Sequence, residues 1–268
     1  MDLNFVTFGD GSNRWKLAAR RLHREARRSG WFSSTQVYDL GRLIHEAGAD
    51  ASGLQEYTRS SSRGFGYWLW KPILLKTLLS SLAPNSLLVY LDAGCQLNVN
   101  QNSKKRLEDY AHTAQENGIF AMETGLALKD WCKQDLLQRL RISDADASKF
   151  LVEPGVLFMA NTPHAREFVS TWLDLCLESS NHFLDDSPSA TANTPDFVEH
   201  RHDQSIFSCL YVARGIPSCP VETYFPNEWT TRGMTYPIWA ARNSYPFKVV
   251  GPSLSARIVT KLRPLRGN

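Results

Sequence analysis

The stretch LLVYLDAG, residues 87–94, decides the fold class that we expect for this chain. Its first five residues are apolar without alternation, which is typical of a central strand in a parallel sheet that helices cover on both faces. The strand is expected to stop at Asp92-Ala93-Gly94, a sequence that favours a turn. In open α/β sheets a ligand binds beyond the carboxyl ends of the strands, so Asp92 lies where we expect a site.

Strand and helix signals alternate on both sides of this stretch. Further strands are expected at 3–8, 36–40, 118–122 and 155–160. Helices are expected from a Ser12 cap to about 29, from Pro72, at 103–117, at 128–140, from about 162 and at 202–213. This alternation predicts an α/β sheet with short crossover connections.

The organisation of the chain shows neither an internal repeat nor a linker, so we expect a single domain over residues 1–268. The segment at about 179–199 is rich in Ser, Asn, Asp, Thr and Pro and lacks periodicity, which predicts a long flexible surface loop. The aromatic and proline-rich C-terminal end predicts only short strands.

Composition limits the class of protein. With 43% apolar and 21% charged residues among 268, the chain fits a soluble globular protein, and no apolar run approaches the roughly 18 residues of a membrane span. The N-terminus lacks a charged-then-apolar signal, and the five scattered cysteines lack metal-ligand spacing. We therefore expect a cytoplasmic location. A net charge of +3 does not by itself indicate nucleic acid.

Lys71 lies within the stretch YWLWKP, residues 67–72, where Pro72 suits the first position of a helix. A cation at the positive end of a helix is unfavourable unless an anion lies nearby. Asp92, at its strand end, is suited to a divalent cation shared with phosphate oxygens. We therefore expect a metal-bound diphosphate between Asp92 and Lys71, with Arg63 adding a bidentate phosphate contact.

Four blocks together resemble a known family: RGFGYWLWKPILLKTL (63–78), LLVYLDAGCQLN (87–98), EPGVLFMAN (153–161) and HRHDQSIFSCL (200–210). Their order, over about residues 3–210, is similar to that in bacterial GT-A glycosyltransferases, which transfer sugars from nucleotide-diphosphate donors in polysaccharide and O-antigen biosynthesis. The resemblance implies a Rossmann-like, mixed and mainly parallel sheet. It also implies a nucleotide-sugar donor and a glycan or lipid-linked acceptor.

The resemblance assigns site residues as well. Thr7, Phe8 and Gly9 would contact the nucleoside, and Asp92 would take the first position of an Asp-x-Asp motif that binds Mn or Mg. Gly94 stands where that motif has its second aspartate. Two alternatives follow: Asp92 holds a cation together with diphosphate and water, or the enzyme works without metal, assisted by Lys71 and Arg63.

Asp203 is the first choice for the residue that orients a sugar hydroxyl or acts as base, and Glu153 and Glu123 compete with it. Both the inverting and the retaining outcome stay open. Simpler structural roles stay open too: Asp92 can end its strand in an Asx turn, and Asp203 can cap its helix.

The helix at 14–28 carries Leu17, Ala18, Leu22 and Ala26 as its expected apolar stripe, which leaves the arginines at 20, 21, 24, 27 and 28 on exposed faces. A solvated face is the leading interpretation, and contact with an anionic membrane surface is the functional one. No RNA-binding aromatic motif accompanies the arginines, so nucleic acid is not expected as a partner. A non-catalytic nucleotide- or sugar-binding module and a membrane-surface adaptor are the alternative functions.

Overall fold

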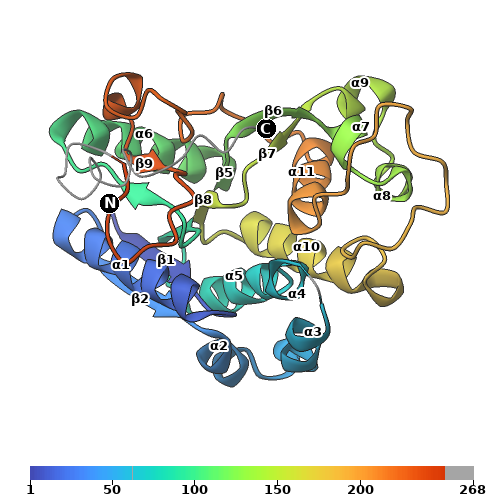
Figure 1. Ribbon diagram of the computed structural model, residues 1–268, viewed down its shortest axis with the longest axis horizontal. Helices are drawn as coiled ribbons and strands as arrows, with labels where there is room; N and C mark the ends of the chain where they lie inside the picture. The colour runs from blue at the N-terminus through green and yellow to red at the C-terminus, as the bar shows by residue number, and fades with distance from the viewer. Residues whose placement is uncertain (62, 251–268) are drawn as a thin grey trace. The chain divides into compact units, whose positions relative to one another are not determined.

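The computed structural model describes residues 1–61 and 63–250 of the chain (Figure 1). These residues form two compact units, each assembled from separate stretches of sequence. Of these described residues, unit 1 comprises Met1–Asp39, Val89–His112 and 222–250; unit 2 comprises those within Leu40–Leu88 and Thr113–Val221. The expectation of one domain over the whole chain stays a prediction.

Unit 1 begins with strand β1 (Leu3–Phe8), helix α1 (Asn13–Ser29) and strand β2 (Ser34–Tyr38). The two strands pair in parallel from Asn4↔Ser34 to Phe8↔Tyr38, and α1 packs on both. Ser12 caps α1 as predicted, and Gly30 ends the helix in the left-handed conformation. The unit also contains β4 (Gln96–Leu97), most of α6 (Gln101–Asn117), the 3-10 helix η2 (Arg232–Thr235) and β9 (Ile238–Trp239).

Unit 2 is mainly helical. Its longer helices are α2 (Leu40–Ala47), α3 (Leu54–Ser60), α5 (Trp70–Ser81), α10 (Pro163–Asn181) and α11 (Asp203–Ala213). Its shorter elements are η1 (Gly48–Ala51), α4 (Gly64–Tyr67), β5 (Ile119–Phe120), β6 (Glu123–Ala127), α7 (Leu128–Trp131), α8 (Gln134–Arg139), α9 (Asp144–Ala147), β7 (Phe150–Val152) and β8 (Val156–Ala160). Helix α10 packs on α5 and on α11. The ring of Trp172 in α10 contacts the ring of Phe207 in α11.

The main sheet has the strand order β2-β1-β3-β8-β5, and β3 (Leu87–Leu91) contributes to both units. Within unit 1, β1 and β2 are parallel; within unit 2, β5 and β8 are antiparallel. All five residues of β3 are buried, as expected for a strand that is apolar on both faces. The predicted fold class, α/β with a mixed and mainly parallel sheet flanked by helices, is confirmed.

Several predicted boundaries were wrong. The helix expected at 128–140 is two helices, because Cys132 is extended and the Lys133 amide donates to the His200 ring instead of continuing the helix. Helix α5 begins at Trp70, so Pro72 is its third residue. The strand expected at 118–122 contains only the two residues of β5.

Candidate functional site

The ends of β1 and β3 in unit 1 meet the same turn of helix α1. A side chain at Gly9 would meet the Ala19 Cβ at 2.5 Å and the Trp15 carbonyl oxygen at 2.6 Å. Ala93 packs against Ala18 and Ala19. The structure therefore brings the predicted nucleoside segment, Thr7 to Gly9, and the Asp92 turn together against one helix.

Thr7 and Phe8 are buried in this region. The Thr7 hydroxyl makes no hydrogen bond with any residue that the structure describes, which is unusual for a buried polar atom. Contact of these residues with a nucleoside stays a prediction.

Asp92 follows β3 directly and is half-buried. The Tyr90 hydroxyl donates a hydrogen bond to its Oδ1 at 2.5 Å, and its carbonyl oxygen accepts from the Cys95 amide at 2.9 Å. The second bond joins two backbone groups and closes the turn that the Asp-Ala-Gly sequence predicted. An Asx turn made by the Asp92 side chain stays a prediction.

Gly94 has a packing reason to lack a side chain. A Cβ there would lie 3.2 Å from the Arg242 Cα and 3.5 Å from the Asn243 amide nitrogen. The Asn243 amide donates to the Gly94 carbonyl at 2.8 Å, which holds the two chain segments together. An aspartate in this position would press on the 242–243 backbone.

The expectation that Arg21 lies on an exposed face of α1 and Leu17 in its apolar stripe was wrong. Arg21 is 3% exposed, whereas Leu17 is 42% exposed. The Arg21 guanidinium donates to the carbonyl oxygens of Ala93 (2.7 Å), Cys95 (2.8 Å) and Asn243 (3.2 Å), and it pairs with Glu25 at 2.8 Å. Arg21 thus holds the turn that follows Asp92 against helix α1 through hydrogen bonds to its carbonyl oxygens. Helical spacing could have indicated that Arg21 is buried, because residues 18, 21, 22, 25 and 26 share one face of the helix.

The side chains near Asp92 do not form a complete cation site by themselves. The described part of the chain contains no cluster of three His, Cys, Asp or Glu side chains that could hold a metal ion. Divalent cations bound through carboxylates usually need one or two of them together with phosphate oxygens and water, and here Tyr90 already bonds one oxygen of the single carboxylate. We therefore derive no step through a metal.

Lys71 in unit 2 has a protein anion beside it. Its Nζ lies 3.1 Å from Oδ2 of Asp203, and the two residues are 2% and 3% exposed. Lys71 lies in the first turn of α5, and Asp203 is the first residue of α11. The carboxylate stabilises a cation that the start of α5 would otherwise disfavour. A buried pair of this kind joins two of the sequence blocks, 63–78 and 200–210.

The backbone next to this pair is strained. Phe65, Tyr67 and Trp68 all have positive φ, and so does His202 (φ 52°, ψ −124°), the residue before Asp203. The His202 ring packs on Tyr67 and Trp68 at centroid distances of 4.7 and 5.9 Å. Residues other than glycine adopt a positive φ at a cost in free energy, and such residues gather at functional sites. The strained backbone therefore makes this part of unit 2 a candidate site.

Arg63 lies at the edge of the same region. Its guanidinium is 3.6 Å from Asp186 and 3.4 Å from Glu199, with all three side chains substantially exposed. The Tyr67 hydroxyl also donates to Asp186, at 3.0 Å. The structure thus gathers Arg63, Lys71 and Asp203 in unit 2, whereas Asp92 and Gly94 belong to unit 1. That Lys71 and Asp92 hold one diphosphate stays a prediction.

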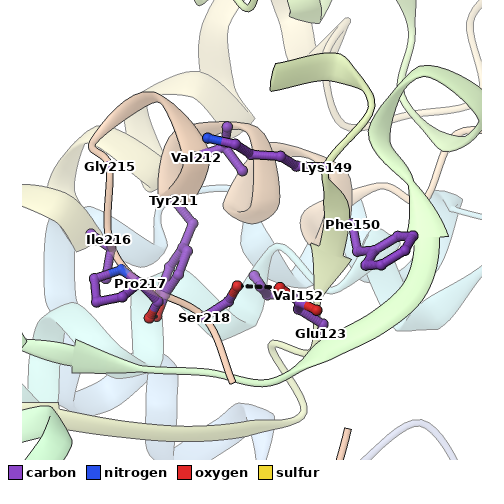
Figure 2. Close-up of a pocket in the computed structure, with 10 residues that line it drawn as sticks. All are labelled: Glu123, Lys149, Phe150, Val152, Tyr211, Val212, Gly215, Ile216, Pro217 and Ser218. Atoms are coloured by element: carbon purple, nitrogen blue, oxygen red, sulfur yellow. Dashed lines mark hydrogen bonds between the residues drawn. The ribbon is translucent and has the colours of Figure 1, made fainter. Parts of the chain in front are cut away.

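The two competing carboxylates lie elsewhere in unit 2, on either side of Val152. Glu153 is half-buried, and its amide donates to the Met122 carbonyl at 2.8 Å. Glu123 pairs with Val152 in register and lines a cavity of about 420 Å³, where the Ser218 hydroxyl donates to it at 2.5 Å (Figure 2). The other lining residues are Lys149, Phe150, Val152, Tyr211, Val212, Gly215, Ile216 and Pro217.

The segment predicted as a flexible loop at 179–199 is tied to α7 and α8 by side chains. Asp135 accepts the amides of Ala190 (2.6 Å) and Thr191 (2.8 Å), and a ring nitrogen of His182 lies 2.8 Å away. Burial alone would raise the pKa of Asp135, but these hydrogen bonds hold the pKa well below its usual range. The flexibility of the segment stays a prediction.

His200 anchors the end of that segment. Its ring bonds the Phe183 carbonyl oxygen at 2.7 Å and the Lys133 amide at 3.2 Å. Burial, helped by the Lys133 charge, lowers the pKa of His200 to about 3, so the ring is neutral near pH 7. These anchoring roles have no signature in the local sequence, because only tertiary contacts define them.

No protein-family model matches the chain, and no curated protein does either. Several solved structures are similar to it, and three of them are glycosyltransferases. Mouse xyloside xylosyltransferase 1 in its apo form shares 11% identity over 82% of this chain and 85% of its own, with a TM-score of 0.46. A glycosyltransferase involved in glycosylation of the major capsid of PBCV-1 shares 13% over 89% and 92%, with a TM-score of 0.44. The galactosyltransferase LgtC, in complex with donor and acceptor sugar analogs, shares 14% over 98% and 95%, with a TM-score of 0.45.

Proposed function

We propose that the protein is a glycosyltransferase that moves a sugar, of the hexose type, from a nucleotide-diphosphate donor to a glycan or lipid-linked acceptor. The proposal starts from the four sequence blocks that resemble GT-A enzymes. The observation that carries it is the buried Lys71–Asp203 pair, because two blocks that are distant in sequence meet there beside strained backbone.

In the proposed reaction the bond between the anomeric carbon and the diphosphate oxygen breaks, and the acceptor hydroxyl oxygen bonds to that carbon. The diphosphate leaves with the electron pair, and the hydroxyl proton passes to a carboxylate. The transition state has oxocarbenium character, so a stabilised leaving group and a placed hydroxyl carry most of the catalysis.

Asp203 is the proposed base or hydroxyl-orienting residue. The Lys71 ammonium at 3.1 Å favours its charged form, which is the form that accepts a proton. The burial of both side chains equally supports a positioning role, in which Asp203 fixes Lys71 for the donor phosphates. Glu153 and Glu123 are the alternative bases. Thr7, Phe8 and Gly9 are proposed to contact the nucleoside, and Arg63 the phosphates.

Titration of UDP, GDP and their sugars, each with and without Mn²⁺, tests the proposal. We expect at least one donor to bind and the matching free nucleoside diphosphate to compete with it. If none of them binds under either condition, the chain is not a nucleotide-sugar transferase.

The absence of a second aspartate at position 94 favours one other function, a non-catalytic nucleotide- or sugar-binding module. Donor turnover that disappears in Asp92→Ala, with the circular dichroism spectrum unchanged, would exclude that module. The exposed arginines of α1 at 20, 24, 27 and 28 support a further proposal, contact with an anionic membrane surface where lipid-linked acceptors reside. Among the described residues no helix is long and apolar enough to cross a membrane.

A further inference from the structure

Arg242 occupies an unusual position in unit 1. Its Cα would lie 3.2 Å from a Cβ on Gly94, so the arginine stands directly against the residue that replaces the second aspartate of the resembled motif. Its side chain is exposed, and it forms no ion pair with any side chain in the described ranges 1–61 and 63–250. A charged side chain without an ion-pair partner in those ranges is thus anchored beside Gly94, which follows Asp92 by two positions.

The backbone holds Arg242 in place at a cost. Its φ is 50°, in the left-handed region that a residue with a side chain adopts only when its surroundings impose it. The neighbouring residues impose it here. The Ala241 amide donates to the Trp239 carbonyl at 2.8 Å, the Asn243 amide donates to Gly94, and the buried Arg21 guanidinium holds the Asn243 carbonyl. Glycine at this position would relieve the strain. The presence of arginine instead indicates a role for its side chain that offsets the strained backbone.

A second arginine lies beside the same segment. Arg14, in the first turn of α1, donates through Nε to the Ser244 hydroxyl, and its guanidinium lies 5.6 Å from the centre of the Tyr245 ring. Two residues of extended chain span at most about 7 Å, so the Cα of Ser244, the partner of Arg14, lies within that distance of the Arg242 Cα. The first turn of α1 holds no acidic residue. The first turn of the 17-residue helix α1 therefore adjoins the segment at 242–245, whose Arg242 and Asn243 backbone packs on Gly94.

We propose that Arg242, assisted by Arg14, supplies a cation for the diphosphate of the donor, in place of a metal ion held by a second aspartate. The inference rests on the proposed function, because it names the leaving-group contact of that reaction. A guanidinium matches two phosphate oxygens with parallel N–H donors and carries a fixed positive charge, so it stabilises the leaving diphosphate without a metal. A side chain at position 94 would crowd the backbone of Arg242 and Asn243.

Calorimetric titration with UDP, GDP and inorganic pyrophosphate in the presence of EDTA tests the inference. Wild-type protein is expected to bind UDP or GDP, and pyrophosphate, without metal. Arg242→Gln is expected to weaken both by about 10- to 100-fold, the loss of one charge-assisted contact. Arg242→Lys should retain part of the affinity, and Arg59→Gln, an exposed arginine of α3, should bind as the wild type does.

Arg242→Gly separates binding from folding. It should lose affinity as Arg242→Gln does while unfolding at the same or a higher temperature, because glycine accepts the positive φ without strain. The inference is overturned if Arg242→Gln and Arg242→Gly bind the nucleoside diphosphate and pyrophosphate as the wild type does. It is also overturned if these ligands bind only when Mn²⁺ replaces EDTA. In both cases the glycosyltransferase proposal stands. If pyrophosphate binding depends on Arg242 but no nucleotide-sugar binds or turns over, the anion site stands and the proposed function fails.

Discussion

Removal of the Lys71 charge should reveal how strongly the buried pair holds unit 2 together. The Nζ–Oδ2 separation of 3.1 Å corresponds to an attraction of about 5 kcal/mol at an effective dielectric constant near 20. Both side chains are nearly inaccessible to water, so Lys71→Met leaves the Asp203 carboxylate buried without its cation. We expect the free energy of unfolding to fall by about 3–5 kcal/mol.

The double variant Lys71→Met/Asp203→Asn supplies the decisive comparison. It removes both charges, so it should be more stable than Lys71→Met alone, and the coupling energy of the double-mutant cycle should be well above 1 kcal/mol. Urea unfolding followed by circular dichroism measures all four proteins, with equal m-values as the check that the same transition is compared. If Lys71→Met costs less than about 1 kcal/mol and the two substitutions are additive, the pair is not a buried ion pair in solution.

Three further predictions concern the supports of the site. Arg21→Gln should lower the free energy of unfolding by about 3 kcal/mol in urea, because the carbonyls of Ala93 and Cys95 lose their donor, whereas exposed Arg20→Gln should change it by less than about 0.5 kcal/mol. Gly94→Asp should lower the melting temperature without creating Mn²⁺-dependent activity, because the new Cβ crowds the Arg242 backbone; a gain of such activity would refute the packing explanation. Burial lowers the pKa of His200 to about 3, so between about pH 6.5 and pH 3 the unfolded chain binds a proton there that the folded chain does not. His200 should therefore lower the free energy of unfolding by about 1.4 kcal/mol for each pH unit of acidification in this range. Urea titrations at pH 6.5 and 5 should show a shallower decline for His200→Gln than for wild type, and equal slopes would contradict a buried neutral His200.

Local pattern was sufficient for the parts of the fold that local physics determines. The unbroken apolar run at 87–91 predicted a buried central strand, and Ser12 predicted the start of α1, because a side-chain cap and two-sided burial are visible in neighbouring residues. The break between α7 and α8 was not predictable in this way. It depends on the Lys133 amide donating to His200, which lies 67 positions further along the chain.

The site shows the same division. The sequence drew attention to Lys71 and Asp203 separately, and only the fold shows that each is the other's counter-ion. The sequence left Arg242 unassigned, because its importance comes from a positive φ and from contact with Gly94, neither of which leaves a local signature. Arg21 was misplaced because an arginine on a helix is normally solvated, and its carbonyl partners belong to distant segments.

Release of nucleoside diphosphate from a panel of nucleotide-sugars is the most direct assay of the proposed transferase activity. We expect release from at least one donor by wild-type protein, its loss in Asp92→Ala, and its retention in Arg59→Gln, with the sugar recovered on an acceptor or as free sugar. Wild-type protein that releases no nucleoside diphosphate from any donor, with or without Mn²⁺, would contradict it.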